Sequence, residues 1–213
     1  MSLRVLIACE FSGVVRDAFR ALGCDAVSCD LLPTERPGPH IQGDVLEVLG
    51  DGWDLMIAHP TCRRLTNAGS RWLVVPPRDR TLAEKWAELE EASAFYRALR
   101  DAPIPRKAIE NPVMHKHARA RIQPGFRQIV QPWWFGEPYF KATGLELIGL
   151  PPLVPTLKLT PPRKGTAEHK AWSRVHREPP GPDREKNRSR SFPGMARAFA
   201  DQWGDPTPVQ VVA

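Results

Sequence analysis

A cysteine and a glutamate that could take part in covalent chemistry each follow a short apolar stretch of the sequence. Cys62 ends the run His59-Pro-Thr-Cys62, after the largely apolar stretch 54–58, and Glu110-Asn-Pro112 follows the short stretch 107–109, which ends in Ala and Ile. A thiolate is a strong nucleophile, and a carboxyl group can hydrogen-bond or protonate a ring nitrogen. Taken singly, a cysteine in this position is more often an inert loop thiol, and a glutamate is more often paired with an arginine. Their shared position after an apolar stretch favours a joint chemical role.

The elements that would position these residues begin with a strand–helix–strand pattern. An apolar strand is predicted over residues 4–9, a helix over 14–22 and a second strand over 26–29. A Pro-rich loop at 33–39 and a short helix after Gly43-Asp44-Val45 follow, and then a third strand over 54–58. This order is typical of an α/β protein with a mostly parallel sheet flanked by helices.

The second half of the chain is less regular. A long helix is predicted over 82–100, a strand over 107–109 and one or two strands within 135–150. Residues 151–182 are rich in Pro, Lys and Arg without clear periodicity and are interpreted as a surface insertion. A closing helix is expected over 191–203.

Ligands of open α/β sheets bind at the carboxyl ends of the strands. Glu10-Phe-Ser-Gly13 and Asp30 occupy such positions in this chain, as do the runs that contain Cys62 and Glu110. Gly13 would let the backbone approach a ligand, and Asp30 could bind ribose hydroxyls. Asp30 and Asp44 could equally be ordinary turn or helix caps.

The pair formed by Cys62 and Glu110 fits addition to a pyrimidine ring. Cytosine C5 is a poor nucleophile until a thiolate adds to C6 and makes the ring enamine-like. A carboxyl group at N3 helps this addition. A cysteine and a glutamate at the ends of neighbouring strands could supply both groups.

With these motifs the sequence resembles the DNA cytosine-5 methyltransferases, in a shortened form like those of phages and prophages. The resemblance extends over most of residues 4–203. The matching segments, in family order, are Phe11-Ser-Gly13, Asp30, Asp44-Val45, Pro60-Thr-Cys62, Glu110-Asn-Pro112, Phe135-Gly-Glu-Pro138 and Arg190-Ser-Phe-Pro-Gly194. The chain departs from the family at Val14-Val15, where glycines are usual, at Thr61, where proline is usual, and at Tyr139 and Lys141. The family's closing Gly-Asn pair is not visible.

The resemblance implies a Rossmann-like class I fold in a single domain, 1–213, with residues 151–182 in place of a target-recognition domain. S-adenosylmethionine is the implied methyl donor. Its implied binding residues are Phe11, Gly13, Asp30, Asp44, Val45 and Pro60. Cys62 would attack C6, Glu110 would engage N3, the methyl group would pass to C5, and a base would remove the C5 proton. Such enzymes serve DNA methylation and restriction-modification.

Three alternatives remain open beside this interpretation. An amino-methyltransferase is one, although its catalytic loop carries an aromatic residue where Cys62 stands. A catalytically inactive DNA-binding protein, such as a decoy or regulator, is the second, and the missing glycines after Gly13 favour it. The third keeps the thiolate addition but transfers another group or acts on a free nucleotide.

The charge of the chain is compatible with a nucleic-acid partner. The net charge is +6 and the pI is about 9.4. Double-stranded DNA is the expected partner, with the target base flipped out of the stack. Trp133, Trp134 and Trp172 could stack or wedge, but the first two could as well pack internally. The predicted nucleic-acid-binding residues are Arg63, Arg64, Lys141, Arg163, Lys164, Arg184, Lys186, Arg188 and Arg190.

Other features narrow the protein class. No apolar run approaches the length of a membrane span, so a cytoplasmic protein without membrane contact is expected. The four cysteines form no CxxC pair and stand at no zinc-ligand spacing, so we expect free thiols and no metal. Cys9, Cys24 and Cys29 are interpreted as apolar filler. The recognition sequence and the oligomeric state cannot be deduced.

DNA binding should weaken steeply as salt rises, because phosphate contacts release counterions. Neutralising Arg184, Lys186 and Arg188 together should flatten the plot of log affinity against log salt by about 0.9 per lost phosphate contact. Fluorescence anisotropy with labelled duplex DNA measures this slope. An unchanged slope would mean that these residues form only a solvated surface.

Overall fold

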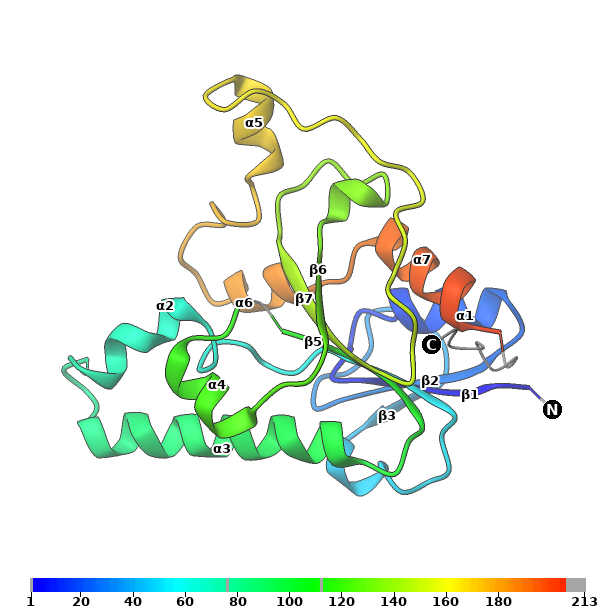
Figure 1. Cartoon of the computed structure of the whole chain (residues 1–213), viewed down its shortest axis with the longest axis horizontal. Helices are drawn as coiled ribbons and strands as arrows, with labels where there is room; N and C mark the ends of the chain where they lie inside the picture. Colours follow the sequence, from blue (N-terminus) through cyan, green and yellow to red (C-terminus); the bar gives the residue numbers. More distant parts are fainter. Residues whose placement is uncertain (1, 76, 112, 206–213) are drawn as a thin grey trace.

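A seven-stranded sheet, ordered β3-β2-β1-β4-β5-β7-β6, forms the centre of the molecule (Figure 1). The computed structural model describes residues 2–75, 77–111 and 113–205. The strands from β1 to β5 are parallel, and β7 runs antiparallel to both of its neighbours, β5 and β6. The strands are β1 (Arg4–Ala8), β2 (Asp25–Asp30), β3 (His40–Gln42), β4 (Leu55–Ala58), β5 (Arg106–Glu110), β6 (Arg127–Val130) and β7 (Thr143–Ile148).

The helices of the described residues are α1 (Val14–Ala21), α2 (Asn67–Ser70), α3 (Leu82–Asp101), α4 (Lys116–Ile122), α5 (Ala167–Trp172), α6 (Arg184–Ser189) and α7 (Pro193–Trp203). Short 3-10 helices are η1 (Val45–Glu47), η2 (Arg71–Leu73) and η3 (Pro132–Trp134). Helices α1 and α7 cover one face of the sheet, and α3 and α4 cover the other. The long helix α3 begins at a capping box, in which Thr81 and Glu84 bond each other's backbone N–H groups.

Apolar residues of β1 alternate between two cores, one on each face. Val5 and Ile7 pack with α1 and α7, whereas Leu6 and Ala8 pack on the side of α3 and α4. Figure 1 shows α1 beside α7, and α3 beside α4 at another side of the sheet. A parallel strand buried on both faces has to be apolar throughout, which is why β1 and β4 read as continuous apolar runs.

The expected α/β architecture with a mostly parallel sheet is confirmed, and so are the strands and helices with long apolar patterns. Strand β1 ends at Ala8, one residue earlier than predicted, because Cys9 has a positive φ of 57°. Residues 135–150 contain one strand, β7, and the segment 151–182 contains the helix α5. The prediction missed β3, β6, α2, α4 and α6, which are all short. Pro112 of the motif after β5 lies outside the described residues.

In the described part of the chain, no helix combines the length and the apolar character needed to cross a bilayer.

A buried carboxylate joins α3 to the β6–β7 hairpin. Glu146 of β7 is 1% exposed. Its Oε2 accepts a hydrogen bond from the Tyr96 hydroxyl at 2.7 Å, and its Oε1 accepts one from the Gly125 N–H at 2.7 Å. The antiparallel end of the sheet is therefore fastened to the long helix through a polar contact in the core.

Replacing Tyr96 with Phe should lower the free energy of unfolding by about 1–3 kcal/mol, because a buried carboxylate oxygen loses its donor. Urea denaturation followed by circular dichroism measures this loss. In the Glu146→Gln background the same substitution should cost less, because the oxygen left unpaired is no longer charged. Equal costs in both backgrounds would contradict the contact.

Candidate active site

The predicted site residues converge because the central strands are parallel and in register. Ala8 of β1 pairs with Ala58 of β4, and Ala58 pairs with Ile109 of β5. The residues that follow, Glu10, His59 and Glu110, therefore lie along one edge of the sheet. This edge includes the point between β1 and β4 where the strand order reverses, which is where α/β sheets bind ligands.

Glu110 is held by two basic groups. Nδ1 of His59 lies 2.5 Å from Oε2 of Glu110, and Nζ of Lys141 lies 3.7 Å from Oε1. The side chains are largely buried, with exposed fractions of 8% for His59, 13% for Glu110 and 17% for Lys141. Lys141 also donates to the Arg188 carbonyl at 3.2 Å. The reversed direction of β7 brings its amino end to this edge, and Lys141 stands two residues before it.

The basic partners keep Glu110 ionised. Burial by itself would raise the pKa of Glu110, but the Lys141 charge and the His59 hydrogen bond outweigh it and hold that pKa at about 2. The group is therefore a carboxylate at neutral pH and has no proton of its own to donate.

Cys62 lies on the loop after β4, near Glu110. Its carbonyl accepts hydrogen bonds from the N–H groups of Leu65 and Thr66, at 3.0 and 3.1 Å. Burial raises the pKa of the Cys62 thiol, and the negative charge of Glu110 raises it further, while Lys141 and Arg188 lower it. The positive charge that acts on the thiol therefore comes from later parts of the chain.

The two arginines that follow Cys62 differ in their surroundings. Arg64 pairs with Glu88 of α3 at 2.7 Å, and Arg63 is exposed. Behind them, the ring of His115 contacts the Arg64 carbonyl at 2.9 Å through Nε2. The N–H of His115 donates to the Leu65 carbonyl at 3.0 Å. The loop that carries Cys62 is thus fastened to α3 and to the start of α4.

A buried carboxylate also stands at the end of β1. Glu10 is 3% exposed, and its Oε1 accepts hydrogen bonds from the Ser12 hydroxyl and, at 3.1 Å, from the Val14 N–H. Its Oε2 has no hydrogen-bond partner among the described residues. Gly13 follows with a φ of 72°, a conformation that favours glycine, and α1 begins at the next residue.

Asp30 and Asp44 approach the end of β1 from one side. Burial raises the pKa of Cys29 to about 11, and the charges of Asp30 and Asp44 add to this rise. The same two carboxylates help to raise the pKa of Cys9, after burial. Asp30 also accepts from the Leu32 N–H at 2.9 Å, and Asp44 caps η1. Asp30 and Asp44 therefore act as turn and helix caps, as one interpretation of the sequence proposed, and they also lie close to the end of β1. Val45 and Pro60 are buried beside these segments.

Phe11 is buried beneath the basic segment 184–190. Nζ of Lys186 lies 5.5 Å from the centre of the Phe11 ring. Glu35, whose N–H donates to the Phe11 carbonyl, pairs with Lys186 at 3.2 Å and accepts two bonds from Arg190, at 2.8 and 2.9 Å. The predicted cofactor residue and two predicted DNA-binding residues thus meet at one carboxylate.

The remaining basic residues are spread out. Arg163 and Lys164 are exposed on the segment before α5, and Arg184 donates to the Glu178 carbonyl at 2.9 Å. Trp172, expected as a stacking or wedging residue, is 6% exposed and packs on Phe140 with ring centres 5.3 Å apart. Its position is that of a packing residue of this segment.

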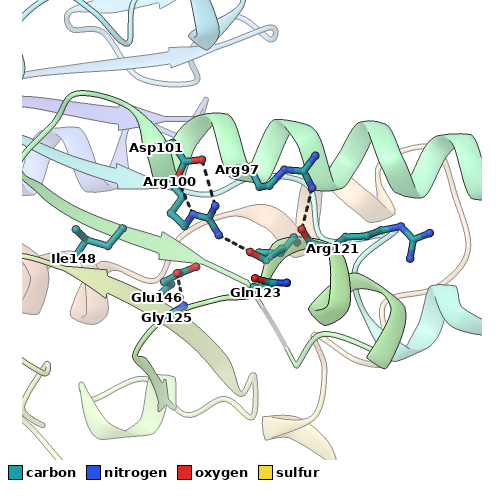
Figure 2. A pocket seen from close by; sticks show the side chains of 9 residues that line it. Arg97, Arg100, Asp101, Arg121, Gln123, Gly125, Glu146 and Ile148 are labelled. Carbon is teal, nitrogen blue, oxygen red and sulfur yellow. Dashed lines mark hydrogen bonds and ion pairs between the residues drawn. The ribbon is translucent and has the colours of Figure 1, made fainter.

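A surface hollow of about 610 Å³ lies elsewhere, between α3, α4 and β7 (Figure 2). Arg97 and Arg100 line it and donate to the carbonyls of Arg121 and Ile122 at the end of α4. These arginines satisfy the last carbonyls of a helix, which is a structural task. None of the predicted site residues lines this hollow.

No group of three or more His, Cys, Asp or Glu side chains that could hold a metal ion occurs within the described residues.

Alkylation of Cys62 by iodoacetamide should be slow at neutral pH and should speed up as pH rises, because a raised pKa leaves little thiolate. Glu110→Gln should speed the reaction by removing a negative charge that raises this pKa, and Lys141→Met should slow it. Peptide mass mapping against pH separates Cys62 from Cys24, which serves as the internal control. Identical rates in all three proteins would contradict the electrostatic coupling.

Comparisons with known proteins give weak likenesses. No family model and no curated protein matches the sequence. A solved structure described as a DNA modification methyltransferase encoded within an E. coli prophage is 13% identical, covering 74% of this chain and 52% of its own, with a TM-score of 0.48. The Entamoeba histolytica methyltransferase EhMeth is 13% identical, covering 78% of this chain and 58% of its own, with a TM-score of 0.43. This chain thus matches little more than half the length of these neighbours.

Proposed function

We propose that this protein is an S-adenosylmethionine-dependent DNA methyltransferase that acts on C5 of cytosine with Cys62 as its nucleophile. The observation that supports the proposal is the position of Cys62 just after β4 and of Glu110 at the end of the paired strand β5, where the carboxylate acts electrostatically on the thiol. The mostly parallel sheet, in which β7 alone of the seven described strands runs opposite to the others, is compatible with the α/β fold of the proposed enzyme.

The residues at the ends of β1 and β2 fit the proposed cofactor. S-adenosylmethionine, when bound, supplies a methyl group from a positively charged sulfur. The unpartnered Oε2 of Glu10 is a buried acceptor, and such an oxygen suits an ammonium group. Phe11, Gly13, Asp30, Asp44, Val45 and Pro60 are the further residues that would hold it. Three carboxylates near one strand end suit a cationic ligand better than an anionic one.

Cys62 and Glu110 act on different atoms of the target cytosine. The Cys62 thiolate forms a bond to C6, and Glu110 stands at the N3 edge of the ring. Lys141 holds Glu110 and also lowers the pKa of the thiol. We infer that Lys141 acts beside the catalytic pair and that its DNA contact, if made, is secondary to this role.

Double-stranded DNA is the proposed substrate, and a duplex cytosine must leave the stack to reach Cys62. Arg63 and Arg188 are exposed near the nucleophile, and Arg163 and Lys164 are exposed on the segment before α5. Phosphate contacts by these residues would orient the duplex and carry no sequence information by themselves.

A second candidate function is DNA binding without catalysis. The observation that favours it is the pKa of Cys62, which burial and Glu110 raise where an active thiol needs a lowered pKa. The catalytic proposal therefore requires a basic side chain to move closer to the thiol, or Glu110 to move away from it, when DNA binds. A trapping experiment separates the two candidates.

DNA that contains 5-fluorocytosine should form a covalent adduct with the protein in the presence of S-adenosylmethionine. Fluorine cannot leave as a proton does, so elimination stalls after the Cys62 bond to C6 has formed. The adduct should survive a denaturing gel and should be absent for Cys62→Ser. Glu110→Gln should slow its formation by about 10²-fold or more, as expected for a lost proton-transfer group.

Cys24→Ser is the matched control and should form the adduct like the wild-type protein. S-adenosylmethionine should raise the melting temperature of Glu110→Gln as it does that of the wild type. Full methyl transfer by Cys62→Ser would point to an exocyclic amino target. DNA binding without an adduct or methyl transfer by the wild type would favour the inactive DNA-binding protein.

A further inference from the structure

His59 is a buried histidine in the candidate site to which the proposed reaction gives no role. It follows β4 directly and precedes the nucleophile by three residues. Its Nδ1 lies 2.5 Å from Glu110, and its backbone N–H donates to the Ala8 carbonyl at 2.9 Å. Both the backbone and one ring nitrogen are therefore fixed.

The other ring nitrogen is not fixed. Nε2 of His59 is buried and has no hydrogen-bond partner among the described residues. Because no such protein atom holds Nε2, the ring can gain or lose a proton there without breaking a contact with them. A histidine that is bonded at one nitrogen to a carboxylate and uncommitted at the other can change its protonation state during a reaction.

The proposed reaction needs a proton at this place. When the thiolate adds to C6, electrons of the ring move to N3, and N3 must be protonated to give a neutral enamine. Glu110 is ionised at neutral pH, because burial is outweighed by Lys141 and His59, which hold its pKa at about 2. The carboxylate needs a donor before it can serve N3, and His59 contacts it directly.

We propose that His59 supplies the proton for N3 through Glu110, as a positioning and proton-supplying partner of that carboxylate. The inference rests on the proposed function. The Sγ–C6 bond forms as the C5–C6 double bond shifts to C4–C5. The N3–C4 double bond breaks at the same time, and its electron pair moves to N3, which takes the proton. The Nδ1 proton of the imidazolium passes to Glu110, and the carboxyl group delivers it to N3. Elimination returns the proton by the same route, so neither residue is consumed.

Charged groups from several elements surround this pair. Glu110 ends β5, Lys141 precedes β7, and Cys62 shares the loop of His59. Arg188 of α6 acts on the thiol and accepts a bond from Lys141 through its carbonyl. The rate of the reaction should therefore depend on pH in two opposed ways. The Cys62 thiolate, which the addition needs, forms as pH rises, and the His59 imidazolium, which supplies the proton, is lost as pH rises.

The experiment measures the addition step without the methyl donor. Addition to C6 makes C5 exchange its hydrogen with water, so DNA with tritium at cytosine C5 should release tritium into solvent. The wild-type rate should rise and then fall with pH. His59→Asn keeps a side-chain N–H for Glu110 but cannot carry a proton, so its rate should drop by about 10²-fold at neutral pH. Its profile should also lose the fall on the alkaline side.

The control is His176→Asn, which alters an exposed histidine of the same chain and should keep the wild-type profile. Exchange by His59→Asn within a few-fold of the wild type, with the alkaline fall retained, would overturn the inference while the proposed function stands. The absence of any Cys62-dependent exchange and adduct in the wild type would overturn both.

A measurement on the wild-type protein covers the case in which His59→Asn does not fold. With nitrogen-15 in the histidine rings, NMR reports which ring nitrogen carries a proton. Nδ1 of His59 should be protonated at neutral pH, with a downfield proton signal that Glu110→Gln shifts upfield. An unprotonated Nδ1 would overturn the inference, because no proton could then pass to Glu110.

Discussion

Ala58 stands opposite Ile109 in the parallel ladder between β4 and β5, and this register decides which residues can act together. The next residues along the two strands are His59 and Glu110, whose side chains meet at 2.5 Å. A slip of one residue would turn each side chain to the other face of the sheet. The two apolar cores oppose such a slip, because the side chains of β4 that fill one core would move into the other. The packing of the sheet thus protects the geometry of the site.

Electrostatics around Glu110 link the two halves of the site. Lys141 pairs with this carboxylate and also lowers the pKa of Cys62, while Glu110 raises it. The charge of Glu110 and the pKa of the Cys62 thiol are therefore coupled and cannot change independently. A change that neutralises Glu110 should lower the pKa of the Cys62 thiol, and it also removes the charged partner of His59. This opposition is consistent with a site whose charges rearrange when a substrate enters.

The sequence was sufficient for the elements with long apolar patterns. β1 and β4 are continuous apolar runs, and α3 and α7 bury residues at helical spacing. The missed strands β3 and β6 lie at the two edges of the sheet and are half polar, which removes the alternation that marks a strand. The short helix α4 begins at His115, an unusual cap, and carries four basic residues in seven.

That Cys62 and Glu110 would lie near each other was predictable for a related physical reason, whereas their chemical roles remain a proposal. Cys62 and Glu110 follow apolar strands, and parallel strands bring their carboxyl ends together. From the sequence, Lys141 was predicted to bind DNA. That it reaches Glu110 follows from the antiparallel direction of β7, which the sequence does not reveal. His59 received no role, although its place directly after β4 was visible. Its importance depends on which residue stands opposite, and a sequence pattern does not contain the strand register.

Because β7 is reversed, the segment between residues 149 and 183 has to connect the two opposite ends of the sheet; we call this segment the tether. The last residue of β7, Ile148, pairs with Lys107 near the amino end of β5, whereas α6 contacts Phe11 beyond the carboxyl end of β1. The tether must cover the length of β5, about 16 Å for its five residues. A handful of extended residues would reach that far, and each doubling of a flexible loop costs only about 0.6 kcal/mol. Apart from anchors such as Leu153 and Trp172, its length can therefore vary between related chains at little cost to the sheet.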